Sequence, residues 1–139
     1  MVEIVVLSNT AGVGYIEDTV TGEIDGLDNI ENVNTGGGDD QFFISDSDDN
    51  IIDAGGDTNG DEATVTGGTG TITITRTGAD VTVSDGSGSG GIGDDTYLNV
   101  ELINVSGSGS DDTFIVDDAN DNNFDGLGGD DTISYAALA

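Results

Sequence analysis

The chain has 139 residues, of which 29 are aspartate or glutamate and only Arg76 is basic, giving a formal charge of -28 at pH 7. It has no Cys, His or Lys, which excludes disulfides, thiolate or imidazole metal sites, and cysteine, lysine or histidine catalysis. The charge also argues against binding to nucleic acid or insertion into an anionic membrane, because both interactions depend on basic residues.

Short β-like runs alternate with Gly/Asp-rich turns along the chain. In chain order the runs are 3–7, 29–33, 41–44, 50–52, 63–65, 71–75, 81–83, 96–98, 102–105, 113–116, 122–124 and 132–135. Helical periodicity of apolar residues is hard to find, and the runs are too short for ordinary sandwich strands. The pattern therefore predicts an all-β fold, a parallel β-helix or β-roll solenoid with short strands and somewhat irregular coils.

An internal repeat supports this prediction. Residues 30–56 align with residues 102–129 at an offset of 72, so that Phe42 matches Phe114. Because the apolar positions keep phase as well as the glycines, the alignment is typical of a repeat array. We expect residues 1–139 to form one domain of two copies, about 1–65 and 66–139, that is a segment of a larger protein.

The segment between the copies permits two structures. Apolar and polar residues alternate strictly over 71–75 and again over 81–84. A hairpin that turns at 77–80 fits this alternation. Two further half-coils also fit, since Ile72 and Val81 are nine residues apart.

Four Gly/Asp segments carry the chemistry. Residues 90–98, GGIGDDTYL, fit the nonapeptide G-G-x-G-x-D-x-U-x, a calcium-binding β-helix repeat in which U is a large apolar residue. Residues 126–134 depart only at Leu127, whereas 107–115 and 35–43 keep the last aspartate and the apolar residue. Glycine-rich turns can direct several carbonyls to one point. Each turn would supply about half of the six to eight oxygens that calcium takes, so a stacked turn must supply the rest.

The spacing of the aspartates fits such stacking. Asp95, Asp112 and Asp131 are 17 and 19 residues apart, close to the length of two nonapeptides, and Asn122 follows Asn104 by 18 on the opposite edge. We therefore expect the three aspartates on one edge, with ions between them. The predicted calcium ligands are Asp40, Gly90, Gly91, Gly93, Asp95, Gly107, Asp112, Asn122, Gly126, Gly128, Gly129 and Asp131.

Other residues receive structural interpretations. The first aspartate of each pair (Asp94, Asp111, Asp130) is expected to be solvated or secondary, and segments 45–49 and 116–121 are either degenerate half-sites or exposed acidic loops. Arg76 is expected at the surface or paired with an acid. Nothing places Glu31 and Glu101 together as a catalytic pair, so we expect no catalytic residue and no enzyme activity. The predicted core or coil-stacking aromatics are Phe42, Phe43, Tyr97, Phe114, Phe124 and Tyr135.

At these motifs the chain resembles the RTX (repeats-in-toxin), or haemolysin-type calcium-binding, repeat family, most closely at 90–98 and 126–134. Segments such as LDNIENVNTGGGDD are also similar to parts of large secreted bacterial adhesins. The resemblance implies right-handed parallel β-rolls around calcium, type I secretion of the unfolded chain, and calcium-triggered folding outside the cell. Leu127, Ser110 and insertions at 57–62 and 66–89 depart from the family pattern and imply a less regular coil.

The expected function is that of a calcium-dependent structural module, a stalk or spacer in a secreted or cell-surface bacterial protein. Several Ca²⁺ ions are its expected cofactors and neighbouring repeats its partners, with surface or polysaccharide ligands bound by other domains. Without metal the charge opposes compaction, so the metal-free chain is expected to be disordered. Two alternatives are a non-catalytic calcium module of a secreted protease, lipase or polysaccharide-modifying enzyme, and an acidic mineral- or ice-binding protein.

Overall fold

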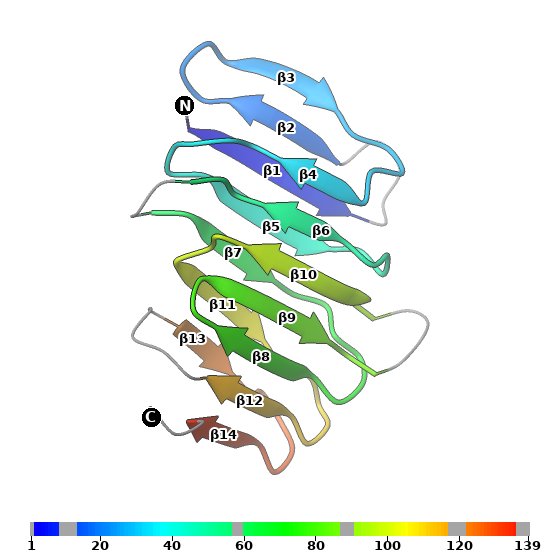
Figure 1. Ribbon diagram of the computed structural model, residues 1–139. Helices are drawn as coiled ribbons and strands as arrows, with labels where there is room; N and C mark the ends of the chain where they lie inside the picture. The colour runs from blue at the N-terminus through cyan, green and yellow to red at the C-terminus, as the bar shows by residue number, and fades with distance from the viewer. Residues whose placement is uncertain (1, 9–13, 57–59, 87–90, 117–121, 136–139) are drawn as a thin grey trace.

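The structure is a computed structural model that describes residues 2–8, 14–56, 60–86, 91–116 and 122–135. Within these ranges the chain is all-β, and its strands form two mixed sheets (Figure 1). The described ranges contain no helix that is long and apolar enough to cross a membrane.

Each sheet has seven strands among the described residues. Sheet A consists, in spatial order, of β13 (Asn122–Asp125), β11 (Leu102–Ser106), β7 (Glu62–Val65), β5 (Gln41–Ser45), β1 (Glu3–Ser8), β2 (Tyr15–Asp18) and β3 (Glu23–Gly26). Sheet B consists of β14 (Thr132–Tyr135), β12 (Thr113–Val116), β8 (Thr73–Thr77), β9 (Asp80–Ser84), β10 (Asp94–Leu98), β6 (Ile51–Asp53) and β4 (Asn32–Asn34). Each run expected from the sequence overlaps a strand, whereas β2 and β3 were not expected because isoleucine and acids are mixed in them.

From β4 onward the chain passes back and forth between the two sheets, and each sheet gains strands in parallel pairing. In sheet A, Phe42 of β5 lies opposite Val5 of β1 and opposite Ala63 of β7. In sheet B, Phe114 of β12 lies opposite Ile133 of β14. Parallel neighbours need a long crossover connection, and here the intervening strand of the other sheet is part of that connection.

Two antiparallel groups, β1–β2–β3 and β8–β9–β10, make the sheets mixed, whereas the sequence predicted parallel ones. Only Gly78 and Ala79 separate β8 from β9. A two-residue connection is the length of a tight hairpin turn, and Gly78 supplies the positive φ, 63°, that such a turn needs, so the chain returns within its own sheet. The segment 66–85 thus contains the hairpin, with Thr77 opposite Asp80.

The hairpin also determines where the two sequence copies lie. Between β4 and β11 the chain changes sheet five times, because β8, β9 and β10 all belong to sheet B. An odd number of changes places equivalent strands in opposite sheets. Phe42 therefore lies in sheet A, and its counterpart Phe114 lies in sheet B.

The core lies between the sheets and follows the period-two alternation of the strands. Phe42, Tyr97 and Phe114 are buried as predicted, and the half-buried Phe124 stacks on Phe114 with ring centroids 4.7 Å apart. The predicted burial of Phe43 and Tyr135 is wrong, since they are 42% and 69% exposed. Phe43 is out of phase with Phe42, and Tyr135 lies on β14, at the end of sheet B.

Of the two positions predicted for Arg76, at the surface or paired with an acid, the surface position is wrong, because its side chain is only 1% exposed. It follows Ile72 and Ile74 in the inward phase of β8. Its guanidinium donates to the carbonyls of Gly78 (3.0 Å), Val100 (2.6 Å) and Glu101 (3.0 Å) and to the side-chain oxygen of Asn122 (3.1 Å). These acceptors compensate the buried charge and connect β8 to β13.

Candidate metal centre

The doubled aspartates form reciprocal hydrogen bonds between neighbouring strands. The backbone N–H of Asp112 donates to Asp131 Oδ1 (2.9 Å), and the N–H of Asp130 donates back to Asp111 Oδ1 (2.8 Å). The second aspartate of one pair therefore accepts from the neighbouring pair, and the first aspartate of that neighbouring pair accepts in return. Charge-assisted bonds of this kind stabilise ionised carboxylates, which partly compensates the repulsion within a pair.

The same arrangement joins β10 to β6. Asp95 Oδ1 accepts the backbone N–H of Asn50 at 3.0 Å, and Asp49 Oδ1 accepts the N–H of Asp94 at 2.9 Å. The second aspartate of this pair, Asp95, is buried and only 1% exposed, whereas the first, Asp94, lies at the surface. The expectation that first aspartates are solvated or secondary agrees with this placement.

The turn glycines allow the strands to stack this closely. Gly93 has a φ of 75°, and a Cβ atom there would overlap the carbonyl oxygen of Asp48. Gly129 has a φ of 123°, and its Cβ would lie 2.5 Å from the carbonyl oxygen of Ser110. Both positions lie in the left-handed region, which favours glycine. Leu127 takes a φ of 62° without being glycine.

Asp112 is enclosed by protein donors. Its Oδ1 accepts the backbone N–H of Ile72 (2.7 Å) and the hydroxyl of Ser108 (3.2 Å), and its Oδ2 accepts the N–H of Ser108 (2.7 Å). The residue is 1% exposed. Both carboxylate oxygens therefore have hydrogen-bond partners in this conformation, and a metal ligated there would have to replace them.

Asp95 lies in a different environment, among Asp46, Asn50 and Tyr97. The Asn50 Nδ2 is within hydrogen-bonding distance of Asp46 Oδ1 (2.7 Å), Asp95 Oδ1 (3.0 Å) and the Asp48 carbonyl (3.0 Å). An amide nitrogen carries only two hydrogens for these three acceptors. The Oδ1 of Asn50 is buried and has no hydrogen-bond partner among the described residues. We call Asp46, Asp48, Asn50 and Asp95 the Asp95 cluster.

The electrostatics of the Asp95 cluster are unfavourable for two anions. Burial raises the pKa of Asp95 to about 6, with a further contribution from Asp46, although hydrogen bonds from Asn50 and Tyr97 oppose the rise. Burial also raises the pKa of Asp46. The Tyr97 hydroxyl donates to Asp95 Oδ2 at 2.9 Å, and burial together with Asp95 raises the Tyr97 pKa well above its ordinary value. Burial therefore makes the ionised form of both acids unfavourable.

The Asp95 cluster has the donor chemistry of a calcium site. Two carboxylates and a carbonyl surround the side-chain nitrogen of Asn50. An ion bound there would displace this nitrogen, and the unpaired amide oxygen of Asn50 would then be a fourth oxygen ligand. Calcium takes six to eight oxygens in flexible geometry, so water or further carbonyls would complete the shell. The described residues contain no group of three or more acidic side chains arranged to hold a metal ion, so two carboxylates are the acidic part of this site.

The other predicted ligands are scattered. Asp131 lies before β14 next to Asp112, but two strands, β8 and β9, separate β12 from β10. The prediction that Asp95, Asp112 and Asp131 lie on successive levels is therefore confirmed for Asp112 and Asp131 and wrong for Asp95, because the hairpin intervenes. Asn122 accepts a hydrogen bond from Arg76, and Asp40 lies at the edge of sheet A, where the N–H of Glu3 donates to its Oδ1.

The predicted glycines that the structure describes belong to three turns, which precede β10, β12 and β14. Gly91 and Gly93 precede β10, and Gly107 packs beside the Asp112 carboxylate. Gly126, Gly128 and Gly129 form the turn before β14. Gly90 lies outside the described residues.

The sequence did not decide whether Asp46 and Asp48, in the acidic segment 45–49, bind an ion, and Asn50 was not among the predicted ligands. A usable signal was present, because Asp46, Asp48 and Asn50 have the D-x-D-x-N spacing that opens a calcium-binding EF-hand loop. Their contact with Asp95 spans 45 residues of sequence. The fold had to be known before the fourth member could be found.

No family model matches this chain, and no curated protein or solved structure shows significant similarity to it.

Proposed function

We propose that this chain is a calcium-stabilised β-solenoid module with a structural role, a stalk or spacer in a secreted or cell-surface bacterial protein, and not an enzyme. One observation carries the proposal: in the Asp95 cluster two buried carboxylates and a carbonyl share the side-chain nitrogen of Asn50, whose own amide oxygen is buried without a partner among the described residues. Buried polar groups of this kind are costly unless a ligand or a donor satisfies them.

The strand arrangement supports the solenoid part of the proposal. The chain alternates between the sheets, adds parallel neighbours and stacks its glycine turns on the backbone of the adjacent level. The right-handed winding implied by the RTX resemblance is part of the proposal. Three strands of sheet B share the same corner, where the carboxylate of Asp95, Asp112 or Asp131 accepts a backbone N–H from the neighbouring strand or the residue that precedes it.

The residues of the Asp95 cluster link distant parts of the chain. Asp46 follows β5 of sheet A, Asn50 precedes β6 of sheet B, and Asp95 belongs to β10. When bound, calcium would supply two positive charges and coordination positions for the oxygens of these residues. Asn50 orients Asp95 through its backbone N–H, and Tyr97 holds the other carboxylate oxygen. The cluster can therefore fasten the two sheets together.

Because of the net charge of the chain, calcium binding at this cluster can decide whether the chain is folded or unfolded. A charge of -28 on a chain with small apolar side chains opposes compaction. Extracellular calcium modules bind at roughly 0.1–1 mM, and one site at 100 times its dissociation constant adds about 2.7 kcal/mol. We infer that the chain folds where calcium is abundant and remains unfolded where it is scarce.

Circular dichroism during a calcium titration of the whole chain tests this function, with magnesium as the control ion. We expect a cooperative gain of β signal near millimolar calcium for the wild type and for Asp94→Asn, and a much weaker response for Asp95→Asn. The two substitutions make the same charge change at neighbouring positions. The same amount of structure in chelator and in calcium would contradict the proposal, and so would equal responses of the two variants.

A further inference from the structure

A second row of carboxylates runs along one edge of sheet A, away from the Asp95 cluster. Strand register places Glu23 of β3 opposite Asp18 of β2, and Asp18 opposite Glu3 of β1. Asp40, immediately before β5, continues the row, since its Oδ1 accepts the backbone N–H of Glu3 at 2.8 Å. Three neighbouring strands and the residue before a fourth therefore each place an acid in this row.

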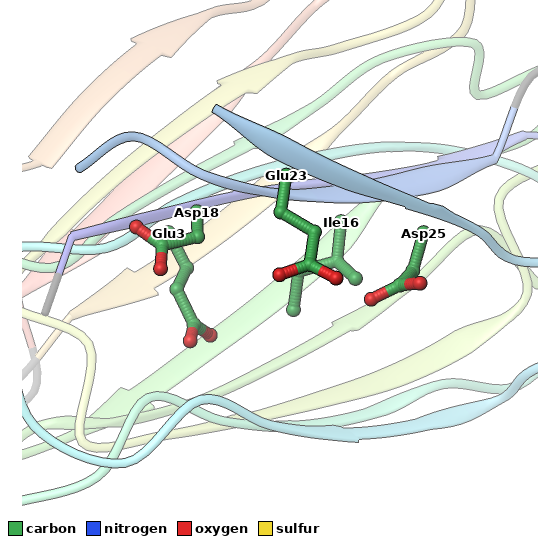
Figure 2. A pocket seen from close by; sticks show the side chains of 5 residues that line it. All are labelled: Glu3, Ile16, Asp18, Glu23 and Asp25. Atoms are coloured by element: carbon green, nitrogen blue, oxygen red, sulfur yellow. The ribbon is translucent and has the colours of Figure 1, made fainter. Parts of the chain in front are cut away.

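The upper part of the row borders a hollow. Glu3, Asp18, Glu23 and Asp25, together with Ile16, line a space of about 140 Å³. Figure 2 shows the four carboxyl groups on the same side of the β1–β3 layer. A water molecule takes about 30 Å³ in the liquid, so the hollow can hold a cation with part of its hydration shell.

The acids at this edge repel one another. Like charges directly opposite on neighbouring strands destabilise a sheet. Burial raises the Glu3 pKa, and the Asp40 and Asp18 carboxylates raise it further. Asp18 remains ionised because the backbone N–H groups of Val20 and Thr21 lower its pKa. The chain's one base, Arg76, is engaged with Val100 and Glu101.

Asp40 gives an independent indication of a ligand. Its side chain is 0% exposed, and its carboxyl group is directed toward β1 at Glu3. Its Oδ2 is buried and has no hydrogen-bond partner within the described ranges. A buried carboxylate oxygen without a donor is expensive, and a cation held between Asp40 and Glu3 would satisfy it.

We propose that Glu3, Asp18, Glu23, Asp25 and Asp40 form a second calcium site, which fastens the β2–β3 hairpin to the body of the protein. Five carboxylates supply only oxygen ligands, and calcium accepts irregular sets of these more readily than magnesium does. As the side chains lie, no three acids among the described residues are arranged to hold an ion, so binding requires a rearrangement. Glu23 and Asp25 are exposed and can rotate toward the ion without disturbing the core. The inference rests on the proposed function only for the identity of the ion, because the two sites share no residue.

Calorimetric calcium titration of the whole chain, with hydrogen exchange of residues 15–26, tests the second site. The test variant is Glu23→Gln with Asp25→Asn, on the exposed edge strand, where loss of charge relieves repulsion and does not endanger folding. The control is Glu17→Gln with Asp28→Asn, which removes the same charge from the opposite face of β2 and from the following loop. Asp95→Asn is measured in parallel.

We expect the test variant to bind one ion fewer, or that ion about tenfold more weakly, and to lose the calcium-dependent protection of residues 15–26. The control variant should keep both. Unchanged binding and protection in the test variant would overturn the inference, as would equal losses in test and control variants. If Asp95→Asn still loses an ion while the test variant keeps all of them, this inference fails and the proposed function stands. If the wild type binds no calcium, both fail.

Discussion

Asp95 and Asp112 occupy the same position in nearly identical sequences, GDDTYL and SDDTFI, yet their surroundings differ. Asp112 accepts hydrogen bonds from Ile72 and Ser108 on both oxygens. Asp95 and Asp46 both accept from the side-chain nitrogen of Asn50, which has fewer hydrogens than nearby acceptors. The motif thus determines that a carboxylate is buried at the corner, and the adjacent strand determines whether protein donors alone satisfy it.

The adjacent strands explain the difference. Asp112 lies next to the start of β8, where an apolar residue, Ile72, offers only its backbone N–H. Asp95 lies next to Asn50, whose side chain brings in a second acid from the turn after β5. The first site is a closed structural corner. The second is the better candidate for an ion.

The largest loss of stability in this comparison should come from removing the Asp112 carboxylate. Asp112→Ala removes the acceptor for two buried backbone N–H groups and one hydroxyl, so we expect a loss of about 4 kcal/mol in the free energy of unfolding. The loss should be the same in calcium and in chelator, measured by urea denaturation. Because the calcium-free chain is expected to be unfolded, this and every later measurement in chelator is made with enough trimethylamine N-oxide to fold it. Asp111→Ala, at the exposed neighbour, should cost less than about 1 kcal/mol. A loss seen only in calcium would make Asp112 an ion ligand, as the sequence predicted.

In chelator, Asp95→Asn should raise the free energy of unfolding, whereas Asp112→Ala lowers it. The amide keeps the shape of the carboxylate and can still bond Asn50 and Tyr97, but it removes a buried charge. We expect the free energy of unfolding at pH 7 to rise by about 2 kcal/mol, while Asp94→Asn should change it by no more than about 0.5 kcal/mol. Destabilisation by Asp95→Asn in chelator would show that its charge is already compensated.

The pH dependence in chelator sharpens the same contrast. Because the folded pKa of Asp95 is about 6 against an ordinary value of 3.8, the folded state binds the proton first as the pH falls. Its stabilising contribution is complete below pH 3.8 and is lost as the pH rises through 6. Between pH 7 and pH 5 the gain should be about 1 kcal/mol. Denaturation curves of the wild type should show this gain, and those of Asp95→Asn should lack it; a gain shared by both would assign it to other acids.

The smallest effect concerns the turns. Leu127 stands where the Asp95 turn has Gly91, and it adopts a φ of 62° while 67% exposed. A left-handed conformation costs a non-glycine residue about 1–2 kcal/mol, and glycine returns part of this through unfolded-state entropy. Leu127→Gly should therefore stabilise the protein by about 0.5 kcal/mol in thermal or urea unfolding. Lower stability would mean that the side chain makes a contact worth more than the strain.

Much of the fold was predictable, because β alternation, glycine turns and buried aspartates are local patterns. The hairpin at 77–80 was one of two structures that the alternation allowed. The alternation of Ile72, Ile74 and Arg76 indicates that Arg76 points inward. The surface position was predicted instead because Arg76 is a lone cation in an acidic chain. The exchange of sheets between the two copies followed from the hairpin and could not be read from the repeat.

The candidate sites were less predictable than the fold. Asp95 and the glycines of its turn follow from the nonapeptide, whereas Asp46 and Asn50 join Asp95 only across 45 or more residues of sequence. The acidic hollow depends on β2 and β3, whose mixed composition gives no clear strand signal. Contacts between strands distant in sequence depend on register, which local patterns do not determine.

Terbium luminescence excited through tyrosine tests the central claim most directly, because Tb³⁺ substitutes for Ca²⁺ and is sensitised only by a tyrosine close to the ion. Tyr97 donates its hydroxyl to Asp95, whereas Tyr135 lies exposed on β14. Tyr15 lies on β2, which borders the acidic hollow, so every protein in this test carries Tyr15→Phe to remove a signal from an ion bound there. We predict a luminescence signal that calcium displaces, that Tyr135→Phe retains and that Tyr97→Phe largely loses. A calcium-displaceable signal that is undiminished in Tyr97→Phe, or the absence of any such signal in the wild type, would contradict an ion at the Asp95 cluster.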